Sequence, residues 1–149
     1  MKSISKPKLA LSGTMIFVCA AALAVTESPW RRTCRAQGGT PWDVRLEDDQ
    51  ITLCRFNGIG VDTETFYHQL ENDNAPQAVS AFLSQPQPGP SSPRVACENS
   101  GGNYVSVVDL EEMPTALCQF SDNSRIEARA FSVGSGPGAG AALARALRP

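Results

Sequence analysis

Two segments of this 149-residue chain repeat one cysteine-centred pattern, and this repeat constrains the fold more than any other feature. Each copy begins with a cysteine, continues with a glycine pair at the same offset, and ends with a Cys-x-Phe step and a later phenylalanine. The first copy holds Cys34, Gly38, Gly39, Cys54, Phe56 and Phe66. The second copy holds Cys97, Gly101, Gly102, Cys118, Phe120 and Phe131. The matched spacing indicates that one small unit was duplicated.

Residues 1–24 have the features of a cleavable signal peptide. Three lysines and no acidic residue stand in the first eight positions, a nearly uncharged stretch follows, and Ala22-Leu23-Ala24 offers a small-x-small cleavage site. An uncleaved anchor is one alternative, but polar residues leave the apolar stretch short of the roughly 20 residues that span a bilayer. A lipoprotein anchored through Cys19 is another, although Val18 stands where lipidation favours a small residue. We expect a mature chain that begins near Val25, is periplasmic or secreted, and has no membrane span.

The mature chain is acidic. Signal cleavage removes three lysines and no acidic residue, so 10 basic and 15 acidic residues remain and the net charge falls from −2 to −5. Binding to phosphate backbones rests on clustered Lys and Arg. We therefore expect no nucleic-acid partner.

A proline-rich segment separates the two copies. Residues 85–93 hold four prolines in nine positions, a composition that favours an extended linker. Before it, Asn74 as a cap, Pro76 in the first turn and apolar residues at helical spacing predict one short helix. The boundaries that we expect are a signal peptide at 1–24, a first repeat unit at 28–70, a short helix and linker at 71–93, a second repeat unit at 94–133, and a flexible Gly/Ala-rich tail at 134–149, with a terminal helix at 141–147 as an option.

Alternating apolar residues predict three short antiparallel strands in each copy. These strands are expected at 42–46, 51–56 and 61–66, with turns at 48–50 and 57–58, and in the second copy at 104–108, 115–120 and 125–131. In a strand Cys54 and Phe56 share a face, so the disulfide and a phenyl ring should build one core. The glycine pairs should allow a backbone turn or a close approach. The expected fold class is mainly β, α+β at most, with two small disulfide-stapled β units joined by the linker.

The repeated pattern resembles the small exported domain of unknown function 333, which carries a haemolysin label in Gram-negative bacteria. The second copy matches its motif in order at Pro93, Cys97, Gly101, Gly102, Cys118, Phe120, Asp122, Ser124, Glu127 and Ala130. Ile126, Asn123 and Arg129 depart from that motif, since the family places its third cysteine, a turn glycine and a tryptophan at these positions. No amphipathic or pore-forming segment accompanies the label.

Four cysteines survive signal cleavage, and an even number in an exported chain indicates two disulfides rather than reactive thiols. Three connectivities are formally possible. We expect Cys34 to pair with Cys54 and Cys97 with Cys118, because the unit must have folded alone before it was doubled. The loss of the family's later cysteines from both copies favours the same pairing. Each half is too small to build a self-sufficient core, so each should depend on its bridge.

The sequence lacks the residue sets of common catalytic sites. It has one histidine, His68, which is expected at the surface end of a strand, with a catalytic or pH-sensing role as the alternative. We find no Gly-x-Ser-x-Gly elbow and no Cys-x-x-Cys pair. The chain is therefore predicted not to be an enzyme, and no cofactor or metal is expected.

Paired acids follow the glycine pairs at the same distance in both copies, as Asp48-Asp49 and Glu111-Glu112. A solvated turn is the ordinary interpretation, a protein-binding patch is the second, and calcium is the third, although neither segment resembles a calcium loop. The leading functional hypothesis is a non-catalytic exported module that binds an unidentified protein or envelope component. The alternatives are an inhibitor of an envelope hydrolase, with Asn57-Gly58-Ile59-Gly60 as its candidate loop, and an enzyme.

Overall fold

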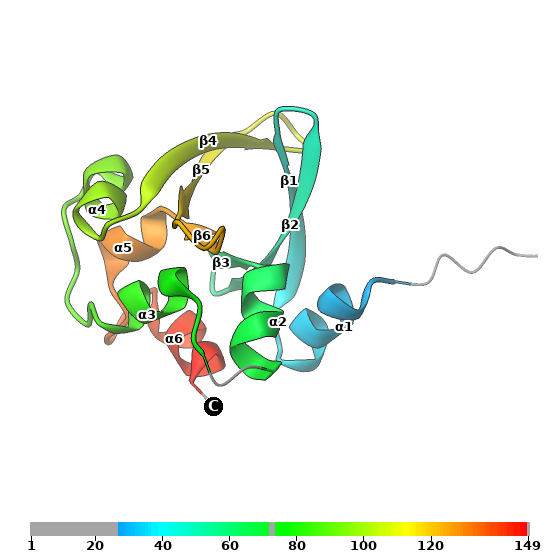
Figure 1. The fold of residues 1–149 in the computed structure, drawn as a ribbon, viewed down its shortest axis with the longest axis horizontal. Coiled ribbons are helices and arrows are strands. Elements are labelled where there is room, and N and C mark those ends of the chain that lie inside the picture. The colour runs from blue at the N-terminus through cyan, green and yellow to red at the C-terminus, as the bar shows by residue number, and fades with distance from the viewer. Residues whose placement is uncertain (1–26, 72–73, 149) are drawn as a thin grey trace, which may run out of the picture.

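A computed structural model describes residues 27–71 and 74–148 of the chain (Figure 1). The predicted signal peptide, its cleavage site and Cys19 lie outside the described residues. Within the described part, each copy contributes a helix, three strands and two further helices in that order. The first copy comprises α1 (Pro29–Ala36), β1 (Thr40–Leu46), β2 (Asp49–Phe56), β3 (Ile59–Asp62), α2 (Thr63–Glu71) and α3 (Gln77–Leu83). The second comprises α4 (Pro93–Asn99), β4 (Asn103–Asp109), β5 (Pro114–Gln119), β6 (Arg125–Glu127), α5 (Arg129–Val133) and α6 (Ala141–Leu147).

The six strands form one closed antiparallel barrel in the order β1-β2-β3-β6-β5-β4. Two seams join the copies: β1 pairs with β4 at Val44↔Asp109, and β3 pairs with β6 at Val61↔Ile126. The mainly β prediction is consistent with this barrel. The prediction of two separate β units is not, because strands of the two copies pair directly. A three-stranded sheet leaves two unpaired edges, and mutual pairing of the copies removes all of them.

The proline-rich segment and the C-terminal segment lie against each other, which corrects the predicted free linker and flexible tail. The backbone N–H of Ser135 donates to Gln85 O at 2.8 Å, and that of Gly136 donates to Pro86 O at 3.0 Å. The optional terminal helix is present as α6, and its Leu143 and Leu147 are fully buried. Apolar side chains on α6 thus anchor a segment whose glycine content suggested mobility.

The first two strands of each copy and helix α3 occur close to their predicted positions, whereas the third strands end early. Asp62 ends β3, and its Oδ1 accepts a hydrogen bond from the backbone N–H of Glu64 at 3.1 Å, which starts α2. Phe66 therefore lies in a helix rather than in a strand, as does Phe131 in α5. Helices α1 and α4 were not predicted, although Ser-Pro marks both starts and the serine side chains cap them.

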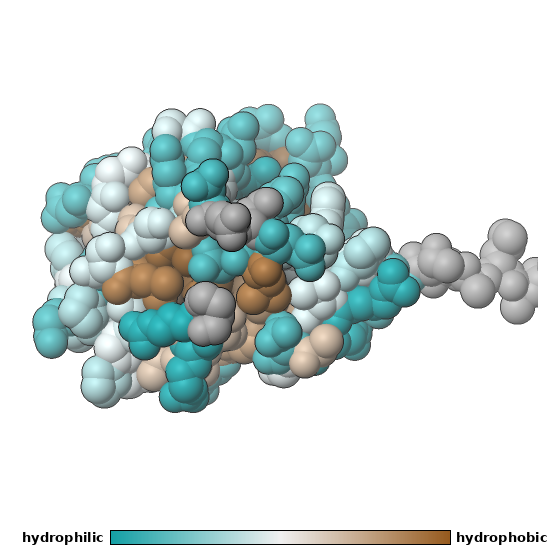
Figure 2. Space-filling model, turned by 60° about the horizontal axis from the view of Figure 1, so that its bottom comes forward, coloured by the Kyte–Doolittle hydropathy of each residue, from teal (hydrophilic) through white to brown (hydrophobic). Residues whose placement is uncertain are grey.

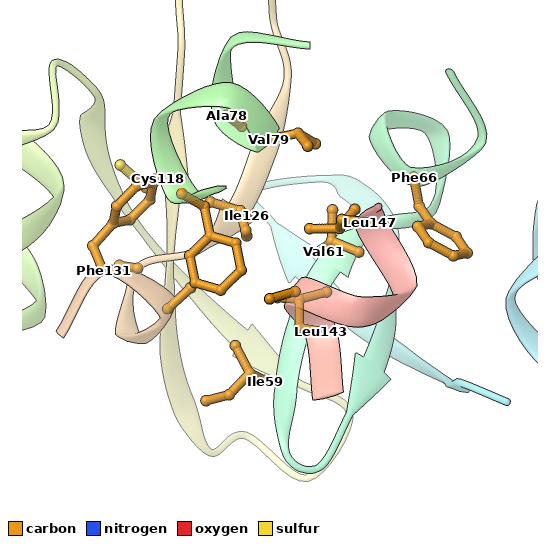
Figure 3. Packing of buried hydrophobic residues seen from close by; sticks show 14 of the residues in the cluster. Ile59, Val61, Phe66, Ala78, Val79, Cys118, Ile126, Phe131, Leu143 and Leu147 are labelled. Carbon is orange, nitrogen blue, oxygen red and sulfur yellow. The ribbon is translucent and has the colours of Figure 1, made fainter. Parts of the chain in front are cut away.

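The larger hydrophobic core packs the helices against one face of the strands (Figure 3). It contains both disulfides and five phenylalanines, namely Phe56, Phe66, Phe82, Phe120 and Phe131. Neighbouring residues on a strand point to opposite faces, so Leu53, next to Cys54, belongs to a second, smaller cluster inside the barrel. The prediction that cysteine and phenyl ring share a core is confirmed. Figure 2 shows that apolar residues reach the coloured surface of the helical side only in small areas between polar ones.

Candidate functional site

Disulfides join Cys34 to Cys54 and Cys97 to Cys118, as predicted. Each bridge ties the first helix of its copy to the second strand, and all four cysteines are fully buried. The glycine pairs serve these bridges. Gly38 and Gly101 have φ values of 80° and 87°, and side-chain atoms on the second glycine of each pair would collide with the disulfide sulfurs. The repeated cysteines and glycines therefore have structural roles.

The paired acids stand in the exposed hairpin turns that flank the β1–β4 seam. Asp48 lies in the turn between β1 and β2, and Asp49 starts β2. Glu111 and Glu112 lie between β4 and β5, where Glu112 forms an ion pair with Arg45 of the first copy. No group of three or more His, Cys, Asp or Glu side chains is arranged to hold a metal ion in the part of the chain that the structure describes.

The turn between β4 and β5 is a loop whose backbone is hydrogen-bonded to Asp109, and it has two apolar side chains at its surface. Leu110 and Met113 are 61% and 59% exposed. The buried carboxylate of Asp109 accepts hydrogen bonds from the backbone N–H groups of Glu111 and Met113, both at 2.9 Å, and the Asp109 N–H donates to Met113 O at 3.0 Å. The corresponding turn in the first copy has only two residues, both polar. Sequence reasoning missed these residues, although the signal was present as two apolar residues that flank a double acid.

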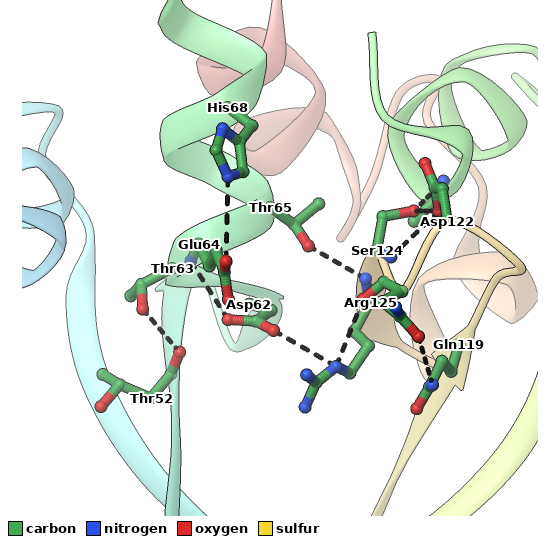
Figure 4. Close-up of polar contacts among 12 residues, drawn as sticks. Thr52, Asp62, Thr63, Glu64, Thr65, His68, Gln119, Asp122, Ser124 and Arg125 are labelled. Carbon is green, nitrogen blue, oxygen red and sulfur yellow. Dashed lines mark hydrogen bonds and ion pairs between the residues drawn. The ribbon is translucent and has the colours of Figure 1, made fainter.

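A polar cluster lies where β3 meets β6 (Figure 4). Asp62 is only 5% exposed, and its Oδ2 lies 3.4 Å from Nε of Arg125. The Arg125 backbone N–H donates to Oγ1 of Thr65 at 3.0 Å. Burial raises the pKa of Asp62 to about 6, against the opposing effects of the Arg125 charge and the Glu64 N–H. Sequence reasoning did not single out Asp62 or Arg125, because only the meeting of the two copies buries them together.

Glu127 is buried on the other side of the same seam. Its Oε2 accepts a hydrogen bond from the Gly60 N–H at 2.8 Å, and its Oε1 lies 3.4 Å from Nη2 of Arg55. Asp62 and Glu127 each follow one of the two residues that pair across the seam, Val61 and Ile126. The duplication has therefore produced a buried acid at the corresponding place in both copies.

His68 lies on α2, not at the end of a strand as predicted. Its side chain is half-exposed, and its Nε2 lies 3.8 Å from Oε1 of Glu64, one helical turn earlier. The expectation of a surface histidine agrees with this exposure.

Two hollows adjoin the Asp62–Arg125 pair, and Glu64 and Arg125 line both. The first, of about 410 Å³, extends past His68 towards Asp122. Burial works to raise the pKa of Asp122, but hydrogen bonds from the Gln77 N–H and from Ser124 outweigh it and hold that pKa below its usual value. The second hollow, of about 460 Å³, extends towards Trp30 at the start of α1.

The segment considered as an inhibitory loop, Asn57-Gly58-Ile59-Gly60, does not project as a loop. Asn57 and Gly58 form a tight turn with φ values of 51° and 79°, which confirms the predicted turn. Ile59 is fully buried at the start of β3, and Gly60 is buried beside it. Only two residues are therefore available to a partner there.

None of the helices within residues 27–71 and 74–148 combines the length and apolarity needed to cross a membrane. Comparison with known proteins found no matching family model, no matching curated protein and no matching solved structure. The resemblance to the domain of unknown function 333 therefore stays a prediction.

Proposed function

We propose that the mature chain is a non-catalytic exported module that binds a protein of the cell envelope or the extracellular space through the loop at residues 110–113. The observation that carries this proposal is the exposure of Leu110 and Met113 on a loop that buried Asp109 holds in place. Single exposed apolar residues are ordinary on a protein surface. Leu110 and Met113 lie on one four-residue loop and suit the apolar centre of an interface. Because hydrogen bonds already order the loop backbone, binding would lose little conformational entropy there.

Charge supports a partner with a basic surface around an apolar pocket. Glu111 and Glu112 lie between the two apolar side chains, and the mature chain would carry a net charge of −5. Complementary charge at the rim of an interface speeds association and selects partners. The predicted leader and the two disulfides support a periplasmic or secreted location for this encounter.

The test is capture from an envelope extract by the mature protein and two variants. Leu110→Ser/Met113→Ser removes the two exposed apolar side chains of the loop. The control, Val95→Ser, removes an apolar side chain that is 42% exposed on α4, outside the loop. We expect one protein to be retained by wild type and by Val95→Ser and lost by the loop variant. Equal retention by all three, or no retained protein at all, would contradict the proposal.

An inhibitor of an envelope hydrolase is the second candidate function. Its contact with the enzyme would be the loop at residues 110–113 rather than the segment at 57–60. If the captured protein is a hydrolase, its activity should fall in proportion to added mature protein until the two are equimolar. Full activity of the saturated complex would exclude this candidate and leave the binding function standing.

A further inference from the structure

We propose that the hollow of about 460 Å³ in the first copy binds the free carboxylate of an amino acid or short peptide, received by the guanidinium of Arg125. The start of α1, the first half of β2 and the junction of β3 with α2 form the walls. Arg125 enters from β6 of the other copy. The volume lies in the range of small-molecule sites.

The two Nη atoms of the Arg125 guanidinium are available as hydrogen-bond donors. Its Nε lies 3.4 Å from both Oδ2 of Asp62 and the backbone oxygen of Asn123. Neither Nη atom forms a hydrogen bond or ion pair with any residue that the structure describes. Figure 4 shows the guanidinium of Arg125 beside the Asp62 carboxylate, which a dashed line joins to Nε. A guanidinium fork binds a carboxylate through two parallel N–H···O bonds, so the two Nη donors define the chemistry of the ligand.

The arginine is held in place before any ligand arrives. The Glu64 N–H fixes one oxygen of Asp62, and the other oxygen faces Arg125. Thr65 fixes the Arg125 backbone through its hydroxyl. Asp62 is thus a positioning residue for the fork, and its burial gives the pair little freedom. Such preorganisation reduces the entropy that binding would otherwise lose.

The second copy has a corresponding hollow of about 310 Å³, which is lined by Tyr104 and Arg129 of that same copy and by no arginine of the first copy. Val61 pairs with Ile126, and Arg125 is the residue just before Ile126. The matching residue for the second hollow is the one just before Val61, which is Gly60 and has no side chain. Pro93 lines the second hollow at the position that Trp30 has in the first, counted from the first cysteine of each copy. Duplication made two hollows, and only the first has acquired an arginine from the opposite copy.

The remaining charges favour a zwitterion or monoanion over phosphate. Arg31 is already paired with Asp43 at 2.8 Å, while Asp49, Asp62 and Glu64 also line the hollow. These carboxylates would repel a dianion, but the exposed Glu64 can accept the ammonium of an amino acid or peptide. Trp30, 40% exposed, offers a ring face to an aromatic side chain.

The experiment is an NMR titration of the full mature protein with the dipeptide Gly-Phe and, separately, with its C-terminal amide. We expect Gly-Phe to shift amide signals around residues 30–31, 50–52 and 62–64, with affinity roughly tenfold or more above that of the amide, since two charge-assisted hydrogen bonds are lost with the carboxylate. Arg129→Gln, at the second hollow, should bind like wild type.

The matched variant is Asp62→Asn/Arg125→Gln, which removes the fork without leaving a buried carboxylate unpaired. Gly-Phe affinity should fall roughly tenfold or more in this variant. Equal binding of Gly-Phe and its amide by wild type, shifts confined to the second hollow, or no shifts up to about 20 mM peptide would overturn the proposal, whether or not the variant folds. Leu110→Ser/Met113→Ser should leave Gly-Phe binding unchanged, so this site and the proposed partner loop can fail separately.

Discussion

Asp62 should make the protein more stable in mild acid than at neutral pH. Burial raises its pKa from 3.8 to about 6 in the folded state. The folded protein therefore binds this proton more strongly than the unfolded chain, and the advantage disappears as pH rises from about 4 through 6. A shift of this size corresponds to a decrease of roughly 2–3 kcal/mol in the free energy of unfolding between pH 4 and pH 7.

Urea denaturation at pH 4, 5, 6 and 7 measures this effect, with Asp62→Asn as the comparison. The amide cannot titrate, so the difference between the two curves isolates Asp62 while Glu64, His68 and Arg125 stay in both proteins. We expect wild type to lose roughly 2–3 kcal/mol relative to the variant across this interval. Parallel curves, or a wild type that gains stability with pH relative to the variant, would refute the reasoning.

In the wild-type curve taken alone, two other carboxylates act in the opposite direction below about pH 4, and the comparison with Asp62→Asn cancels their effect. Burial works to raise the pKa of Asp43, but hydrogen bonds from Thr52 and Arg31 and the Arg31 charge outweigh it and hold that pKa below 3.8. The pKa of Asp122 is likewise lowered. Both groups contribute stability at higher pH that is lost as pH falls below about 4.

Three further predictions concern packing and the disulfides. Gly102→Ala should destabilise the protein by roughly 1–3 kcal/mol in urea denaturation, because its Cβ would collide with the Cys118 sulfur and lie 3.2 Å from that of Cys97; an unchanged midpoint would contradict the close approach. Leu147→Ala should cost about 2–5 kcal/mol, since the side chain is fully buried in the main core, whereas a cost below 1 kcal/mol would mean that α6 does not pack there. Reduction of both disulfides should lower the thermal midpoint strongly, as a loop of about 20 residues contributes roughly 3 kcal/mol, and a midpoint that dithiothreitol leaves unchanged would show that the bridges are not needed.

The sequence predicted the features that depend on local spacing. The cysteine pairs, the glycine turns, the first two strands of each copy and helix α3 all follow from residues within about 20 positions of one another. The Asn57-Gly58 turn is an example, because this dipeptide favours the positive φ values that a two-residue hairpin requires. Because of the duplication, the cysteine and glycine patterns each occur twice in the sequence.

The sequence could not predict how the copies meet. Val61 and Ile126 pair across 65 positions, and nothing in either strand identifies which edge will be its neighbour. The polar cluster was missed for the same reason, since Asp62 and Glu127 are ordinary acids until the other copy covers them. The alternation over 61–66 predicts a strand for Phe66, but Asp62 ends β3 and Phe66 lies in α2.

Both copies form one barrel and should therefore unfold together. Native-state hydrogen exchange in increasing urea tests it directly, by comparing the backbone amides of β2 in the first copy with those of β5 in the second. We expect the most protected amides of both strands to exchange with the same opening free energy and the same urea dependence. A first copy that opens at lower urea while β5 keeps its protection would contradict the shared barrel.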